Sequence, residues 1–207
     1  ENIAMYISEV AFWTHRALWQ LLFGGKFDKF PGLKYAVVEC GSWWVGDLLW
    51  KADVNFGASW KIKKMSSRMK GLLSQLPSQY FGESVFIGAS TMSRYEIRER
   101  QRLGIEALMW GTDYPHPEGS WPNTVHRLES DFQDVSIEDT RRLLGLNAIE
   151  CYNLDVSGLS EVANRIGPTP AKLNQDPDLR TSPKAKREAR WWFDEYGIEW
   201  SGSESGF

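Results

Sequence analysis

The sequence predicts an α/β fold with a parallel sheet. Three short apolar runs, at residues 33–39, 84–88 and 106–110, have the length and composition of buried strands. Segments with helical spacing of apolar residues separate them, and this alternation is typical of parallel sheets. Polar residues follow each run: Glu39, Ser90 and Asp113. Because chemistry in such folds lies at the carboxyl ends of the strands, these positions are the first candidates for a site.

The first half of the chain contains one predicted strand and three predicted helices. Residues 6–29 have three- and four-residue apolar spacing, interrupted at Gly24-Gly25, and Phe30-Pro31-Gly32 ends the segment with turn residues. The strand at 33–39 follows. Helices are predicted at 43–53 and, as a basic amphipathic segment closed by Pro77, at 61–76.

The second half begins with the strand at 84–88, a charged helix at 94–103 and the strand at 106–110. A helix is predicted to start at Ser136, which forms a capping box with Asp139, and its pattern continues to Tyr152.

The composition changes after Asp155. Residues 166–183 are rich in proline and poor in apolar residues, which is typical of a linker or a wrapping tail. A last helix is predicted at 184–196, and its aromatic end is expected to dock on its own domain. We therefore divide the chain into residues 1–155 and a Pro-rich, helical extension, residues 156–207.

The overall composition is that of an ordinary globular protein. The chain has 207 residues, 42% of them apolar, and a net charge of −3, which gives no general attraction to nucleic acid or to an anionic membrane. No apolar run approaches the ~20 residues that span a bilayer. The two cysteines lie too far apart for a CxxC metal site, and we expect a reducing, cytoplasmic location.

Four blocks of sequence, in order, resemble motifs of the amidohydrolase-2 family. They are residues 22–34 (LFGGKFDKFPGLK), 39–45 (ECGSWWV), 110–116 (WGTDYPH) and 147–155 (NAIECYNLD). The family includes aminocarboxymuconate-semialdehyde decarboxylase and related hydroxybenzoate decarboxylases, and the resemblance covers residues 7–155.

The resemblance implies a (β/α)8 barrel that binds one divalent metal, usually zinc and sometimes manganese, through ligands on strands one, five and eight. Asp113 falls on the strand-eight ligand, and Glu39 falls where many decarboxylases carry a histidine near the metal. Only three strands are predicted, and the ligands of strands one and five have no counterpart. The resemblance therefore implies the C-terminal part of a TIM-like barrel. We expect a homo-oligomer, or pairing with a chain that supplies the N-terminal half.

Three polar residues are the candidates for catalysis. Asp113 is interpreted as a metal ligand or a general base, and the alternative is a strand-end aspartate that caps the next turn. Glu39 is a candidate general acid or base because burial at a strand end would raise its pKa, and the alternative is a structural pair with an arginine. His116 is expected to contact substrate or to orient Asp113, with a purely structural role as the alternative.

The candidates for substrate binding are aromatic side chains and one arginine. The indole rings of Trp43, Trp44 and Trp121 are expected to stack on a cyclic substrate, whereas Trp110 is assigned to the core. Arg94 is a candidate clamp for a substrate carboxylate. Core packing for the tryptophans and a solvated helix position for Arg94 are the alternatives. The histidines outside the motif, His15 and His126, are interpreted as packed or surface residues.

These observations predict a metal-dependent hydrolase or non-oxidative decarboxylase of a small cyclic or carboxylated substrate, active once the missing barrel half is present. The alternative is a non-catalytic half-barrel subunit, or a degenerate relative, that binds a partner through its open sheet edge.

Overall fold

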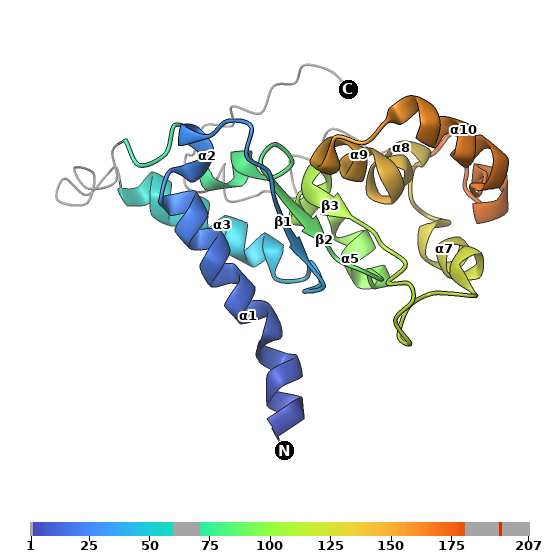
Figure 1. Cartoon of the computed structure of the whole chain (residues 1–207), viewed down its shortest axis with the longest axis horizontal. Coiled ribbons are helices and arrows are strands. Elements are labelled where there is room, and N and C mark those ends of the chain that lie inside the picture. Colours follow the sequence, from blue (N-terminus) through green and yellow to red (C-terminus); the bar gives the residue numbers. More distant parts are fainter. Residues whose placement is uncertain (1, 60–70, 181–194, 196–207) are drawn as a thin grey trace.

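The computed structural model describes residues 2–59, 71–180 and 195, and at its centre lies a three-stranded parallel sheet (Figure 1). The strands are β1 (Tyr35–Val38), β2 (Val85–Gly88) and β3 (Leu108–Met109), in that order across the sheet. Val38 is in register with Gly88, and Gly88 with Met109, so the carboxyl ends of the strands lie side by side. The predicted α/β class and the parallel sheet are confirmed.

One face of the sheet packs against the helices of the first half. These are α1 (Asn2–Phe23), α2 (Lys26–Lys29) and α3 (Val45–Ser59). The break between α1 and α2 falls at the predicted Gly24-Gly25, where Gly25 has a φ of 62°, a conformation that favours glycine. The core of this face joins the helices to alternate strand positions, and includes Leu18, Leu22, Val37, Leu49, Val85, Ile87 and Leu108.

The other face of the sheet carries a smaller core. Phe86 and Met109 alternate with the residues of the first face and pack with Cys151 of α9 (Asn147–Tyr152). The Nζ atom of Lys34 donates a hydrogen bond to the carbonyl oxygen of Glu150 at 2.9 Å, which fixes the end of α9 beside the start of β1. This short helix therefore covers part of the second face.

The segment between β2 and β3 is more broken than predicted. The expected helix over 94–103 is two short helices, α5 (Arg94–Arg98) and α6 (Arg100–Leu103), because Glu99 leaves helical geometry with a ψ of 4°. A 3-10 turn, η2 (Ile105–Ala107), occupies the start of the predicted strand, so β3 keeps only two residues. Another 3-10 turn, η1 (Pro77–Tyr80), precedes β2.

After β3 and the loop over residues 110–123, the regular elements of the described chain are all helical. The elements are α7 (Thr124–Phe132), α8 (Ile137–Arg141), the π-helical turn η3 (Arg142–Leu146), α9, α10 (Val156–Ile166) and the 3-10 turn η4 (Pro170–Leu173). Ser136 caps α8 as predicted, because its hydroxyl accepts a hydrogen bond from the backbone nitrogen of Asp139 at 3.1 Å. No helix was predicted at α10, which begins where the carboxylate of Asp155 accepts hydrogen bonds from Ser157 and Gly158.

The segment after α10 packs on the body, whereas every side chain of α10 is exposed. Leu173 is buried, and the side-chain nitrogen of Gln175 donates to carbonyl oxygens of Phe132 and Val135 in and after α7. The predicted helix at 184–196 lies outside the described residues except for residue 195. Most of the helix predicted at 61–76 does too, and residues 71–76 are not helical. The division at residue 155 stays a prediction.

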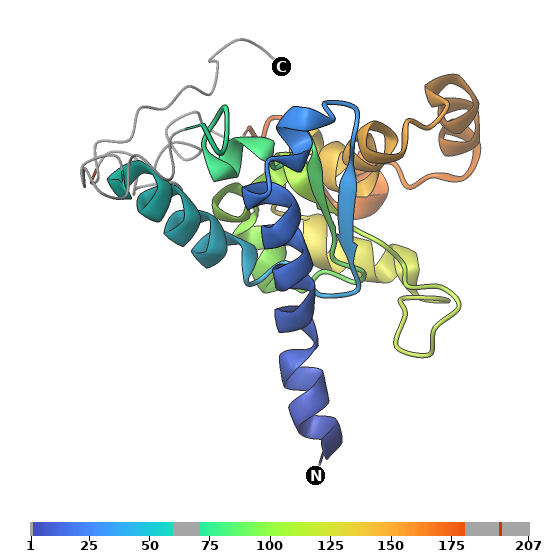
Figure 2. The ribbon, with the colours of Figure 1, turned by 60° about the vertical axis from the view of Figure 1, so that its left-hand side comes forward.

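The N-terminal turns of α1 extend away from the body in both ribbon views (Figures 1 and 2). They expose large apolar side chains, namely Ile3, Met5, Tyr6, Phe12 and Trp13. Among the described helices, none has the length and hydropathy required to cross a membrane.

Candidate functional site

The residues at the three strand ends share an unusual backbone conformation. Glu39, Ser90 and Asp113 have φ values of 58°, 49° and 60°, in the left-handed region that non-glycine residues rarely adopt. Such conformations cost of order 1–3 kcal/mol each and cluster at functional sites. Backbone hydrogen bonds hold the ends together, from Glu39 nitrogen to Gly88 oxygen at 3.0 Å and from Gly111 nitrogen to Ser90 oxygen at 2.9 Å.

The loop after β3 folds back on itself and presents Asp113. The backbone nitrogen of Ser120 donates to the carbonyl oxygen of Thr112 at 2.9 Å, and that of His116 donates to the carbonyl oxygen of Asp113 at 2.8 Å. Gly119 fits in this turn because a Cβ atom there would lie 2.8 Å from the Thr112 oxygen. These hydrogen bonds fix the backbone of the predicted motif at residues 112–116.

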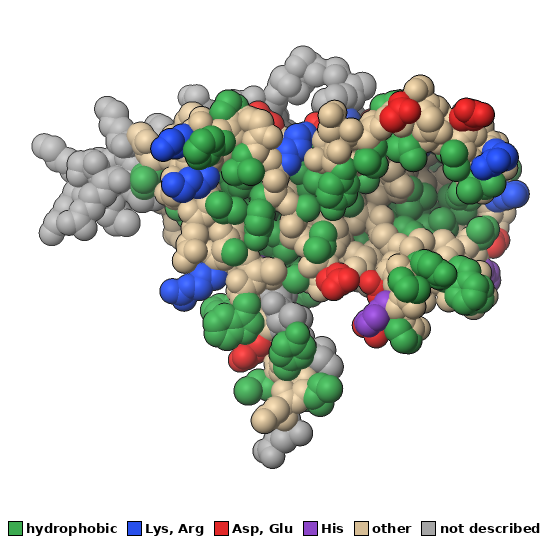
Figure 3. Space-filling model, viewed as in Figure 1, with side chains coloured by type: hydrophobic (Ala, Val, Ile, Leu, Met, Phe, Trp, Pro, Cys, Tyr) green, Lys and Arg blue, Asp and Glu red, His purple; other side chains and the backbone are tan. Residues whose placement is uncertain are grey.

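Asp113, His116 and Glu118 converge at the tip of this loop. The Nδ1 atom of His116 lies 3.2 Å from Oδ2 of Asp113 and 3.2 Å from Oε1 of Glu118. The side chain of Asp113 is 14% exposed, against 58% for His116 and 76% for Glu118. The space-filling view shows histidine and acidic side chains next to each other on this face of the molecule (Figure 3).

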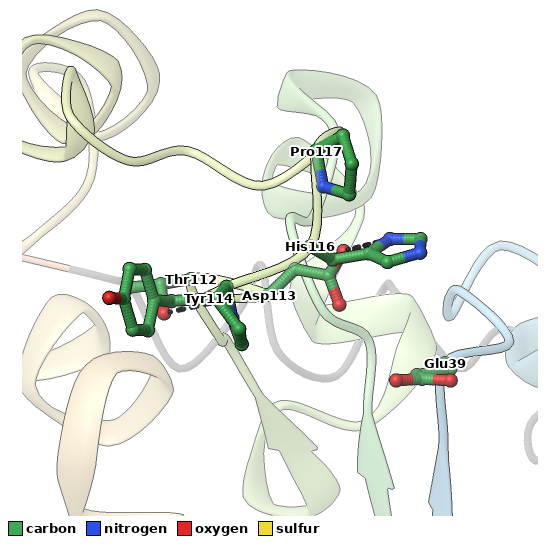
Figure 4. Close-up of a pocket in the computed structure, with 7 residues that line it drawn as sticks. Glu39, Thr112, Asp113, Tyr114, His116 and Pro117 are labelled. Carbon is green, nitrogen blue, oxygen red and sulfur yellow. Dashed lines mark hydrogen bonds and ion pairs between the residues drawn. The ribbon is translucent and has the colours of Figure 1, made fainter.

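An open hollow lies between the loop and the end of β1. Its lining is formed by Glu39 and by residues 112–117. The carboxylate of Asp113 and the ring of His116 lie on the side of the loop that faces Glu39, whereas Tyr114 points the other way (Figure 4). Glu39 is exposed, so the burial that was expected at this strand end is absent.

The other predicted site residues do not line the hollow. Trp121 is 67% exposed, and its ring lies 5.8 Å from that of Tyr114 and not in the hollow. Trp43 is exposed. Trp44 is buried, packs on His15 with 3.9 Å between ring centroids, and donates from its indole nitrogen to the carbonyl oxygen of Cys40.

Arg94 connects two helices. Its guanidinium donates hydrogen bonds to the carbonyl oxygen of Ser130 and, at 3.0 Å, to Oδ2 of Asp134 at the end of α7. The remaining histidines lie apart from the loop. Burial lowers the pKa of His15, and His126 is exposed on α7 with its Nδ1 atom 3.8 Å from Glu129.

Sequence reasoning missed Glu118, and it gave Thr112 and Tyr114, which line the hollow, only as members of the 110–116 motif. The signal for Glu118 is its spacing, because Asp113, His116 and Glu118 form a D-x-x-H-x-E pattern with three potential metal ligands in six residues. The apolar periodicity that marks helices and strands gives no information on a loop, so only this spacing marks Glu118 in the sequence.

The fold and this site define an α/β protein with nitrogen and oxygen donors gathered at the carboxyl ends of parallel strands. The amidohydrolase family model matches residues 11–154, which is most of the chain and includes every residue that lines the hollow. The chain belongs to the amidohydrolase family, whose fold is a TIM barrel and whose members are generally metal-dependent. No curated protein matches the sequence.

The donors of the loop fit a divalent metal. One ligand atom from each of Asp113, His116 and Glu118 lies within 4.8 Å of the others. Two ligands of one zinc ion lie within about 4.4 Å of each other, since each bond is about 2.0–2.2 Å long. Carboxylate oxygen and imidazole nitrogen are suitable donors for zinc and for manganese.

Proposed function

We propose that this chain carries the active-site end of a metal-dependent hydrolase or non-oxidative decarboxylase, related to aminocarboxymuconate-semialdehyde decarboxylase, with a small cyclic or carboxylated substrate. One observation carries the proposal. Asp113 is a mostly buried carboxylate at the carboxyl end of β3, in contact with His116, and it faces the hollow. The family match supports the reaction class, because amidohydrolases are generally metal-dependent enzymes.

In this proposal Asp113 binds the metal, which is zinc or, as the second choice, manganese. A divalent ion at this position supplies Lewis acidity, which polarises a carbonyl or acidifies a water molecule. His116 keeps the carboxylate of Asp113 in place through its Nδ1 atom, 3.2 Å away, and its second nitrogen remains available to a substrate.

Glu39 is the proposed proton donor or acceptor. It belongs to the end of β1, across the hollow from Asp113 and His116 (Figure 4). A substrate in the hollow would therefore lie between Glu39 on one side and Asp113 and His116 on the other. Trp43, Trp44, Trp121 and Arg94 have no place in this proposal because they lie outside the hollow.

We further propose that the sheet is the C-terminal part of a barrel. The consecutive order of β1, β2 and β3 is the order of neighbouring barrel strands, but closure of such a barrel requires eight. Within the described residues β1 and β3 are edge strands, and edges of this kind bind further strands. The other strands would come from polypeptide outside these 207 residues, in the same chain or in a partner of an oligomer.

The test is an activity screen of the completed barrel. We would express residues 1–207 together with the polypeptide that closes the barrel, load zinc or manganese, and assay small cyclic esters, amides and carboxylic acids. We expect hydrolysis or release of CO₂ that a chelator abolishes, and Asp113→Asn should lower kcat/KM by about 10²–10⁴-fold. Glu161→Gln, on exposed α10, is the matched control and should leave the rate unchanged. A folded, metal-loaded barrel that turns over no substrate in the screen would favour the non-catalytic alternative.

A further inference from the structure

We infer that the projecting end of α1 pairs with the same segment of a second copy of this chain, in an antiparallel contact where Glu9 meets Arg16 of the partner subunit. Residues 2–16 of α1 are called the arm. The arm does not line the hollow, so this inference goes beyond the proposed function and does not depend on the proposed reaction.

The arm exposes a large apolar surface. All side chains that the structure describes between residues 2 and 13 are exposed. The large apolar ones are 58–71% exposed, namely Ile3, Met5, Tyr6, Phe12 and Trp13, and apolar side chains cover the part of the helix that leaves the body (Figure 3). A fully covered aromatic side chain buries about 150–250 Å², so the three rings alone leave on the order of 300–450 Å² in water. Exposed apolar patches of this size mark interaction sites.

The arm also has little helical stability of its own. Its isoleucine, threonine and aromatic residues are weaker helix formers than alanine or leucine. A helical segment shorter than about 12–15 residues is marginal in water without packing. The arm is nevertheless helical while it projects from the body in both ribbon views (Figures 1 and 2). It therefore needs a further surface to pack against.

The charges of α1 suit a contact between two copies of the arm. Glu9 and Arg16 are its only acidic residue and its only arginine or lysine, and both are exposed. Their spacing of two helical turns puts them on the same face, about 10 Å apart along the axis and too distant to pair with each other. Neither forms an ion pair with another described residue. Phe12 and Trp13 lie between them, with 5.9 Å between their ring centroids.

A two-fold axis between Phe12 and Trp13 would pair both charges at once. In an antiparallel contact with this axis, Glu9 faces Arg16 of the partner subunit, and Arg16 faces the partner subunit's Glu9. Phe12 then faces Trp13 of the partner subunit, so the rings of both copies gather at the centre of the contact. The surface is therefore complementary to itself, as the interface of a two-fold dimer must be.

The size and charge of the arm favour this partner over a membrane. With Ile3 and Met5 included, two arms leave on the order of 1,000 Å² of apolar surface uncovered, close to the lower limit of about 1,200 Å² for specific interfaces. Helices that bind anionic membranes carry several lysines or arginines on their polar face, whereas the arm has Arg16 alone.

The experiment measures the mass of the whole 207-residue chain in solution by analytical ultracentrifugation at a series of concentrations. We expect a dimer that dissociates on dilution. Glu9→Arg and Arg16→Glu each place like charges opposite each other at both ends of the contact, and each should raise the dissociation constant at least ~10-fold. The double variant with both reversals restores opposite charges, so its dissociation constant should return close to that of wild type.

The matched controls are Glu161→Arg and Arg165→Glu on exposed α10, which should leave the dissociation constant unchanged. Circular dichroism would show that each variant is folded. A monomeric wild type would overturn the inference, and polypeptide outside these residues would then be the candidate cover for the arm. An oligomer that neither single reversal weakens would overturn it as well, because another surface would hold the copies together. A double variant that dissociates as readily as the single ones would contradict the antiparallel contact.

Discussion

The buried carboxylate of Glu96 accepts two hydrogen bonds from Ser42, in the loop that follows β1. The Oε1 atom of Glu96 accepts from the backbone nitrogen of Ser42 at 2.5 Å and from its hydroxyl at 2.9 Å. The Oε2 atom accepts from the backbone nitrogen and the hydroxyl of Ser93, at 2.7 and 2.8 Å. Glu96, which is 6% exposed, thus connects the loop after β1 to the start of α5.

Replacement of this carboxylate should destabilise the fold. In Glu96→Gln, one oxygen becomes an NH₂ group that faces hydrogen-bond donors of Ser42 or Ser93. We expect the free energy of unfolding to fall by about 2–4 kcal/mol, because charged hydrogen bonds are lost and buried donors stay unpaired. Urea denaturation measures the change, and exposed Glu161→Gln should stay within about 0.5 kcal/mol of wild type. A loss for Glu96→Gln no larger than for this control would refute the structural role.

Replacement of Asn147 should destabilise the fold to a similar degree, because its side chain binds the backbone of β3 and of the turn before it. Its side-chain nitrogen donates to the carbonyl oxygens of Ile105 and Leu108 at 2.6 and 2.7 Å, and the residue is fully buried. Asn147→Leu leaves both oxygens without this donor, and we expect a loss of about 2–4 kcal/mol in thermal or urea unfolding. Asn164→Leu on the exposed face of α10 is the control. Equal stability of the two variants would contradict the assigned contacts.

Stability should fall in acid through Asp28. Burial by itself raises the pKa of Asp28, but hydrogen bonds from Ser74 and Tyr80 outweigh it and hold the pKa below its ordinary value. A carboxyl group with a lowered folded pKa stabilises the protein above its unfolded pKa of about 3.9 and loses this effect as the pH falls through the folded value.

The measurement is a pair of unfolding curves for wild type and Asp28→Asn, recorded at about pH 7 and at steps below about pH 4. We expect wild type to be more stable at neutral pH, by about 1 kcal/mol because the site is exposed, and the difference to shrink in acid. A difference that is constant with pH would show that the hydrogen bonds of Asp28 do not depend on its charge.

The sequence predicted the sheet well and the helices after it less well. Apolar runs mark β1, β2 and β3 because buried strands need continuous apolar residues, and this holds even for the two-residue β3. The helix α10 was not predicted, because the segment after Asp155 was assigned as a whole to the Pro-rich extension, and all its side chains are exposed. The local signals for it are the cap at Asp155 and the helical spacing of Val156, Leu159, Val162 and Ile166.

The sequence indicates the place of the candidate residues at the strand ends, and their roles stay predictions. The position of Asp113 follows from the strand before it, but the burial of Trp44 and the exposure of Trp43 do not. These neighbours follow the tight turn at Gly41, where φ is 59°, and packing on His15 decides which ring is buried. Glu118 is marked in the sequence only by its spacing from Asp113 and His116.

The most direct test of the central claim is the metal content of the completed barrel, purified without added metal and measured together with its Asp113→Ala variant. We predict about one zinc or manganese ion per barrel in the wild type, as in catalytic sites of this kind, and loss of that ion in the folded variant. A variant that keeps its full metal content, or a metal-free wild type that is fully active, would contradict the claim that Asp113 binds a catalytic metal.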